Sequence, residues 1–536
     1  RRGGCFEGMP LASVLFALLC AVGCVQGHLQ MGAYPAKTGK GYTFHVWAPH
    51  ASSIKIELRR GKETPLDPVI LTKGDKDVWF GKSDACEKGD DYRIALESSH
   101  NDCFNEEGAV LYRRDPYARW AHVDDFMEAW ARLTDCGTKF PWSTKEHPWL
   151  MKGGCFGHSI YEMHIGTFSK NHSFASATEQ LDHVASLGFT CVELMPVTEF
   201  GGSWGYNPRN CFGIHSPYGS DDDFRAFVDR AHQLNLAVKA DIVLNHGSSR
   251  LNELWNFDGY SGPQGGGIYF DKGGGDTPWG KKFAFDRPEV QEYLLDACRM
   301  FLVEYRCDGL RFDSAHNMPD WLNKNVCNAI RKEFPKAALS AEVVPEDPKF
   351  LRGGVGFDAV WLHAPTFDLI DGVAGKHDHG EWVAKIRSMI RQRWFPDKAA
   401  ATGINGLLGT HDQIGCRKNG GHGGDGRLRR FFQDRVGGRD DWGARAQAKM
   451  WWAAAACGVA SGVPMLFQGT EILQPGWWHT DQYFRWDLAP ENGLGTEGGS
   501  APAIEMMKLV KATLDLRKEH PDVCGHDPQV VHQDEK

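Results

Sequence analysis

The chain has 536 residues, of which 42% are hydrophobic and 24% are charged. This length exceeds one small domain, and the apolar share is sufficient for a folded core, which excludes an intrinsically disordered chain. The 60 basic and 69 acidic residues give a formal net charge of -9, and this acidic balance argues against a general binder of nucleic acid or of anionic membranes.

The N-terminal segment has the pattern of a targeting sequence. Residues 9–27 read MPLASVLFALLCAVGCVQG, and small residues lead up to His28. The apolar run is shorter than the about 20 residues that a membrane-spanning helix needs. We therefore expect residues 1–27 to be a leader with a cleaved signal peptide, which directs the chain to the secretory pathway for secretion or for delivery to an organelle. No other segment is apolar enough to predict a stable membrane span.

The first folded unit is predicted over residues 32–135. Apolar residues alternate with other residues at Phe44 and Val46, and again at Ile54, Ile56 and Leu58. Such period-two alternation, bounded by turn residues, is typical of strands. A Lys-Gly-Asp-Asp turn at 88–91 precedes another strand-like segment. The pattern predicts a small all-β sandwich.

The pattern changes over residues 150–520, where apolar strand-like segments alternate with amphipathic helices. Helices are predicted at 177–189, 221–236, 290–306 and 321–335. Alternation of this kind indicates parallel βα units, and their number favours a closed (β/α)8 TIM barrel over an open sheet. Residues 247–279, rich in glycine and aromatic residues, predict a short inserted loop domain. A second glycine-rich stretch, 419–443, predicts a mobile surface loop.

Polar residues follow four predicted strands at their C-terminal ends, where TIM barrels carry their active sites. These segments are DIVLNH (241–246), GLRFDSAH (309–316), SAE (340–342) and THDQ (410–413). Strand alternation places Arg311 and Asp313 on one face. A single carboxylate beside an arginine is explained by a structural ion pair. Several carboxylates at one barrel mouth are costly through repulsion and desolvation, which indicates catalysis.

Glycoside cleavage is the chemistry that uses such a set. One carboxylate attacks the sugar carbon, and a second, protonated carboxyl group donates a proton to the leaving oxygen. Arg311 would favour the ionised form of Asp313. Histidines can donate hydrogen bonds to sugar hydroxyls, and the 19 tryptophans of the chain include candidates for stacking on sugars.

These four motifs, in this order, resemble the α-amylase family of glycoside hydrolases and transglycosidases. The resemblance implies that Asp313 is the nucleophile, that Glu342 is the general acid/base and that Asp412 stabilises the oxocarbenium-like transition state. It also implies a substrate-binding set, with Asp241 and Asn245 mainly bracing the site. That set comprises Tyr206, Asp241, His246, Arg311 and His411. The alternatives of core hydrogen bonding for His246 and His411, and of simple packing for Tyr206, stay open.

The motifs point to more than one subgroup of this family. The segments SWGYN (203–207), HDQIG (411–415) with Arg417, and PMLFQGTEI (464–472) are similar to branching enzymes, whereas Ser314-Ala315-His316 is closer to trehalose-releasing hydrolases. The first expectation is a 1,4-α-glucan branching enzyme, which cleaves α-1,4 chains with retention and transfers them to a 6-hydroxyl. The alternatives are a maltooligosyl-trehalose trehalohydrolase, another α-glucan hydrolase, or a non-catalytic glucan-binding protein.

The resemblance also implies the remaining components. The segment before the barrel resembles a glucan-binding module, and RRDPYARW (113–120) resembles the connection that follows it. The expected partner is an α-glucan such as glycogen, starch or a maltooligosaccharide, with no nucleic acid. No cofactor is expected, and no metal site, since no paired cysteine or histidine spacing occurs. Residues 521–536 are expected to be the remnant of a truncated C-terminal β-domain. Tyr206, Trp204, Trp477 and Trp478 are the candidates for stacking near the barrel mouth.

Overall fold

The computed structural model describes residues 31–100, 109–121, 128–202, 204–272, 275–391, 403–415, 430–457 and 462–521. The predicted leader, Arg417 and all but the first residue of the predicted C-terminal remnant lie outside these ranges. Within these ranges, no helix combines the length and the apolar character that crossing a membrane requires.

The N-terminal unit consists of two antiparallel sheets packed face to face. The first has the order β1 (Gly32–Pro35), β2 (Tyr42–Trp47), β6 (Val78–Ser83), β5 (Thr72–Lys73). The second has the order β4 (Thr64–Ile70), β3 (Ala51–Arg60), β7 (Asp91–Ser98), β8 (Leu111–Arg113), with β9 (Ala131–Arg132) also pairing with β7. The alternating apolar residues of the sequence all point into the core, since Phe44, Ile54 and Ile56 are at most 1% exposed. The predicted all-β sandwich is confirmed.

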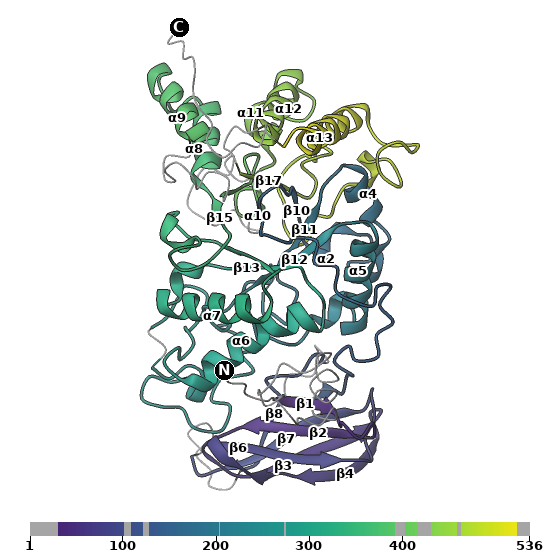
Figure 1. Ribbon diagram of the computed structural model, residues 1–536, viewed down its shortest axis with the longest axis vertical. Helices are drawn as coiled ribbons and strands as arrows, with labels where there is room; N and C mark the ends of the chain where they lie inside the picture. Colours follow the sequence, from purple (N-terminus) through teal and green to yellow (C-terminus); the bar gives the residue numbers. More distant parts are fainter. Residues whose placement is uncertain are drawn as a thin grey trace, which may run out of the picture.

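The second unit is a closed barrel of eight parallel strands, as predicted. Its strands are β10 (Ile160–Met163), β11 (Cys191–Leu194), β12 (Ala237–Ile242), β13 (Gly309–Phe312), β14 (Ala338–Ala341), β15 (Ala359–Leu362), β16 (Gly403–Asn405) and β17 (Val463–Phe467). The main helices around it are α4 (Leu181–Ser186), α5 (Asp221–Gln233), α6 (Pro288–Val303), α7 (Asp320–Glu333), α8 (Ala364–Val373), α9 (His379–Arg391), α12 (Trp442–Ala456) and α13 (Ala501–Glu519). Figure 1 shows the sandwich, in purple, at one end of the molecule beneath the barrel.

The barrel interior is layered along the strands. Every second residue of a strand points inward. The strand beginnings therefore form an apolar floor that includes Ile160, Cys191, Ala237, Ala338 and Val463. Two residues further along β11 and β12, the inward positions carry the charged side chains of Glu193 and Lys239, both at most 1% exposed. The polar site described below lies at the next level, towards the C-terminal ends of the strands.

The insertion at 247–279 packs against the sandwich. Arg113 Nε donates to the carbonyl of Phe257 at 2.9 Å, and His50 Nδ1 lies 2.8 Å from Asp258 Oδ2. Arg114 in the connecting segment forms an ion pair with Glu253, and both side chains are at most 4% exposed. The insertion therefore joins the module to the barrel.

Two local predictions are wrong. Residues 411–414 form the short helix α10 (His411–Ile414) instead of the end of a strand. The cause is a capping box at the start of this helix. The Thr410 side chain accepts a hydrogen bond from Asp412 N, and the Gln413 side chain accepts one from Thr410 N. The predicted surface loop at 419–443 contains the helix α11 (Phe432–Val436), which is anchored because Phe432 is only 1% exposed. Residues 419–429 of that stretch lie outside the residues that the structure describes.

Asp308, directly before β13, ties three segments together at the floor of the barrel. Its Oδ1 accepts from Leu150 N at 2.6 Å, and its Oδ2 accepts from Val238 N at 2.9 Å. His232 Nε2, on α5, lies 2.8 Å from Oδ2. The carboxylate is fully buried and is the acceptor for two backbone donors on separate elements.

We expect Asp308→Ala to lower the free energy of unfolding by about 3 kcal/mol, because each buried donor left without a partner costs about 1–3 kcal/mol. Urea unfolding followed by circular dichroism measures this change. The control is Asp84→Ala, since the Asp84 side chain is 58% exposed, and it should change the value by less than about 0.5 kcal/mol. Equal effects of the two variants would show that Asp308 is not a tie between these segments.

Candidate active site

Arg311 is the centre of the site. It points inward from β13, is fully buried, and its Nη1 donates to Asp241 Oδ1 at 2.9 Å and to Oδ2 at 2.7 Å. The same nitrogen donates to Asp313 Oδ1 at 2.9 Å, and Nη2 lies 2.9 Å from Glu342 Oε2. One guanidinium group thus contacts the carboxylates that follow or end three neighbouring strands. The sequence predicted all four residues, and the structure brings them together.

The backbone fixes the two predicted catalytic carboxyl groups. Asp313 N donates to the carbonyl of Ile242 at 2.9 Å, which continues the pairing of β12 with β13. Asn245 Nδ2 donates to Asp313 O at 2.8 Å and to its Oδ2 at 3.2 Å. Directly after Asp313, Ser314 adopts a left-handed conformation with φ of 44°, and its N–H donates to Glu342 Oε2 at 3.0 Å. The turn after β13 therefore orients both carboxyl groups.

Asp313 and Glu342 share one electrostatic environment. Burial, together with the neighbouring charge of Glu342, raises the pKa of Asp313. Burial would also raise the pKa of Glu342, but Arg311, His363 and the N–H of Ser314 outweigh it and lower that pKa to about 2. The same environment therefore acts oppositely on the two groups, since the pKa of Asp313 is raised and that of Glu342 is lowered. As expected from the sequence, Arg311 favours the ionised form of Asp313, and the same cation also favours ionised Glu342.

Tyr206 and Asp241 form the side wall of the site. Tyr206 OH donates to Asp241 Oδ2 at 2.7 Å, and the Tyr206 ring stacks on His411 with ring centroids 5.0 Å apart. Burial raises the pKa of Asp241 to about 7, against the opposing effects of Arg311 and Tyr206. Tyr206 is half-buried, so part of its ring stays accessible while its hydroxyl fixes Asp241.

His411 is held as a cation by two carboxylates. Its Nδ1 contacts Glu162 Oε1, its backbone N–H donates to Glu162 Oε2 at 3.1 Å, and its Nε2 lies 3.4 Å from Asp412 Oδ1. Burial opposes the charge, but Asp412 and Glu162 raise the pKa of His411 to about 9. The Asp412 side chain is 40% exposed and is therefore accessible to a ligand.

His246 has both ring nitrogens occupied within the protein. Nδ1 contacts Asn245 Oδ1, and Nε2 lies 3.0 Å from the carbonyl oxygen of Tyr206. Burial lowers the pKa of His246 to about 4, against the raising effect of its hydrogen bond with the Tyr206 carbonyl. These contacts brace the segments that carry Asn245 and Tyr206, and a sugar hydroxyl would have to displace one of them.

Sequence reasoning missed two residues of the site. Glu162 lies inside β10 and was read as part of an apolar strand, although it is the partner of His411. His363 follows β15, and its Nε2 lies 3.6 Å from Glu342 Oε1. A polar residue at the C-terminal end of a barrel strand was the signal that identified the other candidates, and the same signal in VWLH (360–363) could have identified His363.

The predicted stacking residues differ in accessibility. Trp478 is 1% exposed and donates through Nε1 to Thr167 Oγ1 at 3.0 Å, so its prediction as a sugar-stacking surface is wrong. Trp204 is half-buried beside Trp478, with ring centroids 5.0 Å apart. Trp477 is 41% exposed. Trp279, from the insertion, is 39% exposed and lies 6.0 Å from the ring of His246, which adds an aromatic residue that the sequence did not single out.

Among the described residues, one group has donor atoms close enough together to hold a metal ion, namely His147, His232 and Asp308. It lies at the floor of the barrel, away from the carboxylates of the site. Both Asp308 oxygens already accept backbone N–H groups. These hydrogen bonds explain the cluster as a structural tie, and the reaction proposed below does not use it.

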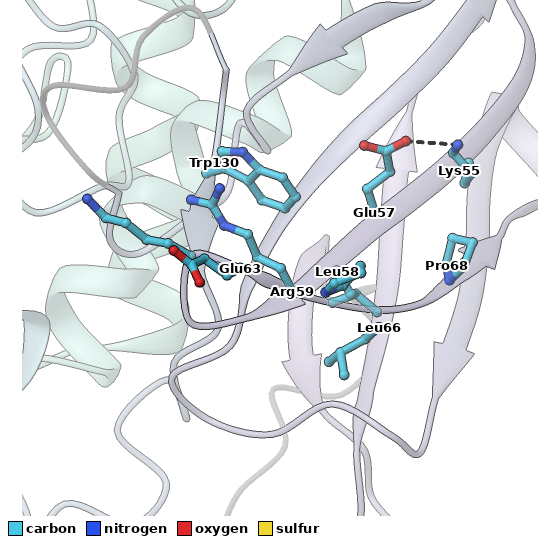
Figure 2. A pocket seen from close by; sticks show the side chains of 10 residues that line it. Lys55, Glu57, Leu58, Arg59, Glu63, Leu66, Pro68 and Trp130 are labelled. Atoms are coloured by element: carbon cyan, nitrogen blue, oxygen red, sulfur yellow. Dashed lines mark ion pairs between the residues drawn. The ribbon is translucent and has the colours of Figure 1, made fainter.

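A separate hollow of about 390 Å³ lies on the sandwich, and Figure 2 shows the side chains that line it. Lys55 and Glu57 form an ion pair of 2.8 Å there. The guanidinium groups of Arg59 and Arg93 lie 4.0 and 4.5 Å from the ring centroid of Trp130. Because these cations already lie over the ring, a sugar could stack on Trp130 only by displacing one of them.

Comparisons with known proteins agree with this architecture. The family "Alpha amylase, catalytic domain" matches residues 173–258, and "Carbohydrate-binding module 48 (Isoamylase N-terminal domain)" matches residues 30–118. The 1,4-alpha-glucan branching enzyme of Fusobacterium nucleatum is 28% identical over 368 residues, which span 63% of this chain and 57% of that enzyme. The malto-oligosyltrehalose trehalohydrolase of Arthrobacter ramosus is 28% identical over 498 residues, 85% of this chain and 77% of that protein. The solved structure of pullulanase from Bacillus acidopullulyticus shares the fold, with a TM-score of 0.71 and 19% identity over 92% of this chain and 64% of that one.

The charge of His411 predicts a specific pH dependence. Its folded pKa of about 9 lies above its usual 6.5, so its contribution to stability is complete below about pH 6.5 and is lost as the pH rises through 9. At about 1.4 kcal/mol per pKa unit, this contribution is about 3 kcal/mol. We expect Glu162→Gln to reduce the decline in unfolding free energy between pH 6.5 and 9 by about half. Urea unfolding at both pH values measures this, and an unchanged decline would contradict the pairing.

Proposed function

Because the chain belongs to the α-amylase family, we propose that it is a retaining enzyme acting on α-glucans and, within that class, a 1,4-α-glucan branching enzyme. The observation that carries the proposal is the joint contact of Asp313 and Glu342 with the two terminal nitrogens of Arg311. A retaining glycosidase needs two carboxyl groups about 5–5.5 Å apart. Two carboxyl groups bridged by a single guanidinium group are consistent with this requirement.

In the proposed first step, Asp313 attacks the anomeric carbon and the bond from that carbon to the glycosidic oxygen breaks. Glu342 donates its proton to the departing oxygen, which leaves a glycosyl ester on Asp313. In the second step, Glu342 removes the proton of an acceptor 6-hydroxyl, whose oxygen attacks the same carbon and releases Asp313. A new α-1,6 linkage results, and Glu342 is protonated again.

This reaction requires an ionised Asp313 and a protonated Glu342 when the substrate is bound, whereas burial and the neighbouring charges raise the pKa of Asp313 and lower that of Glu342. A glycosidic oxygen beside Glu342 would favour its protonated form, because only a neutral carboxyl group can donate a hydrogen bond to that oxygen. Arg311 contacts both groups, so it stabilises the charge on whichever carboxylate carries it. Asp412, exposed at the mouth, would accept hydrogen bonds from the sugar hydroxyls.

A trehalohydrolase is the second candidate, and it too has a specific observation in its favour. Ser314-Ala315-His316 follows the proposed nucleophile, and His316 is exposed at the mouth, with its Nδ1 accepting from Val344 N at 3.3 Å. The two candidates share the first step and differ in the acceptor, which is water in the hydrolase.

Asp313→Asn should abolish turnover of amylose, with a loss of at least about a thousandfold in kcat, because the amide cannot attack the anomeric carbon. Binding of maltooligosaccharides, measured by calorimetry, should persist. The control is Asp515→Asn on α13, where the carboxylate pairs with Lys511 at the surface, and it should retain full activity. Unchanged turnover in Asp313→Asn would contradict the proposed mechanism.

The products formed from amylose show whether the acceptor is a sugar 6-hydroxyl or water. We expect new α-1,6 signals in proton NMR spectra and shorter side chains after debranching, with little increase in reducing sugar. The same assay on a maltooligosyl-trehalose substrate tests the second candidate. Release of free trehalose without α-1,6 signals would replace the branching assignment with the trehalohydrolase.

A further inference from the structure

Trp361 is a buried residue of the barrel interior that the proposed reaction does not use directly. It lies on β15, is 1% exposed, and the face of its indole ring is 4.2 Å from the guanidinium carbon of Arg311. The buried Nε of Arg311 has no hydrogen-bond partner among the described residues. An aromatic face attracts a cation and compensates in part for such a missing partner.

A chain of polar contacts holds the indole from below. Trp361 Nε1 donates to Glu193 Oε1 at 3.1 Å, across the barrel from β15 to β11. The other oxygen of Glu193 accepts from Lys239 Nζ, which also donates to Ser340 Oγ at 2.7 Å. These four side chains are at most 1% exposed. Burying an ion pair at this depth carries a desolvation cost and is weak evidence for stability by itself, so its position beneath Arg311 calls for another role.

We propose that Trp361 is a positioning residue for Arg311 and that the buried Glu193–Lys239 pair sets the orientation of Trp361. The guanidinium group of Arg311 must direct one terminal nitrogen to Asp241 and Asp313 and the other to Glu342. The flat indole face beneath it restricts its tilt, and the Nε1–H···Oε1 hydrogen bond restricts rotation of the indole. This inference rests on the proposed function, since the consequence of the positioning is catalytic.

The alternative is that Trp361 only fills the core. Core filling predicts a loss of stability without a change in the chemistry of the site. Positioning predicts a change in the ionisation of the carboxyl groups as well. The charged or titratable groups that face Arg311 are Asp241 from β12, Asp313 after β13, Glu342 after β14 and the ring of Tyr206. A less firmly held guanidinium favours the ionised carboxylates less, so the acidic limb of the pH profile moves to higher pH.

The first test uses Trp361→Phe, which keeps an aromatic face but loses the indole N–H, and Trp361→Leu, which loses both. We expect kcat on amylose to fall about tenfold and about a hundredfold, respectively, which corresponds to about 1.4 and 2.7 kcal/mol. KM should stay within about twofold, since Trp361 does not face the substrate. Glu193→Gln keeps an acceptor oxygen for the indole. It should therefore lower kcat less than Trp361→Leu does, and it should also move the acidic limb of the pH profile to higher pH.

The matched control is Trp452→Phe on α12. Trp452 is also 1% exposed and also donates through its indole N–H, to Thr513 Oγ1 at 2.9 Å, but it packs outside the barrel against α13. This variant should lower the free energy of unfolding and leave both kcat and the pH profile unchanged. If Trp361→Phe and Trp452→Phe behave alike in kinetics, or if Trp361→Leu leaves the acidic limb in place, the positioning role is overturned.

A second measurement does not depend on turnover. In spectra of protein with 15N-labelled arginine, the Nε–H signal that disappears in Arg311→Lys should show the upfield ring-current shift of a group above an indole face. Trp361→Leu should remove that shift and accelerate exchange of the same proton with water. A wild-type chain that shows the shift but converts no α-glucan would contradict the proposed function alone. A wild-type chain that converts glucan but lacks the shift would contradict the positioning of Arg311 alone.

Discussion

The site depends on one buried cation that faces three carboxylates. Arg311 contacts Asp241, Asp313 and Glu342, which come from three consecutive strands of the barrel. Without a cation between them, these groups could not all approach ionisation at neutral pH, because repulsion and desolvation both oppose it. The arrangement is possible because the parallel register pairs Asp241 with Arg311 and Arg311 with Ser340, which brings the strand ends to one level.

The depth of the barrel explains why that cation can be held in a fixed orientation. The floor is apolar and closely packed, so it fixes the spacing of the strands. The next layer holds the Glu193–Lys239 pair, and the burial cost of that pair is offset within the layer by Ser340 and the indole of Trp361. The order from floor to mouth therefore runs from apolar packing, through a closed polar network, to carboxyl groups with accessible oxygens. Each layer restricts the side chains of the layer above it.

The sequence was sufficient for the barrel and for the central residues of the site, because alternation along a strand determines which residues share a face. Arg311 and Asp313 followed from that rule. Glu162, Glu193 and His363 did not, since a single polar residue in an apolar strand looks the same whether its partner lies across the barrel or is absent. The orientation of Trp478 was also beyond the sequence, because its partner Thr167 lies 311 positions away along the chain. The capping box that makes His411–Ile414 helical is present in the sequence as Thr410 followed three residues later by Gln413. The apolar residues before it predict a strand, and extending that strand through Gln413 was wrong.

The balance of charge in the site fits the transition state of the proposed reaction. The site contains five carboxyl groups, at Glu162, Asp241, Asp313, Glu342 and Asp412, and the cations Arg311 and His411 offset their charge only in part. Arg311 is fully buried, whereas Asp412 is the most exposed of these charged groups. A sugar entering from the mouth would therefore meet carboxylates before cations. A ring that develops positive charge is stabilised by such an arrangement, because the negative groups are already oriented and need no reorganisation as the charge forms. The buried cation Arg311 then has a second consequence beyond holding the site together. It favours the ionised form of all three carboxyl groups that it contacts, and its full burial keeps it away from the accessible end of the site.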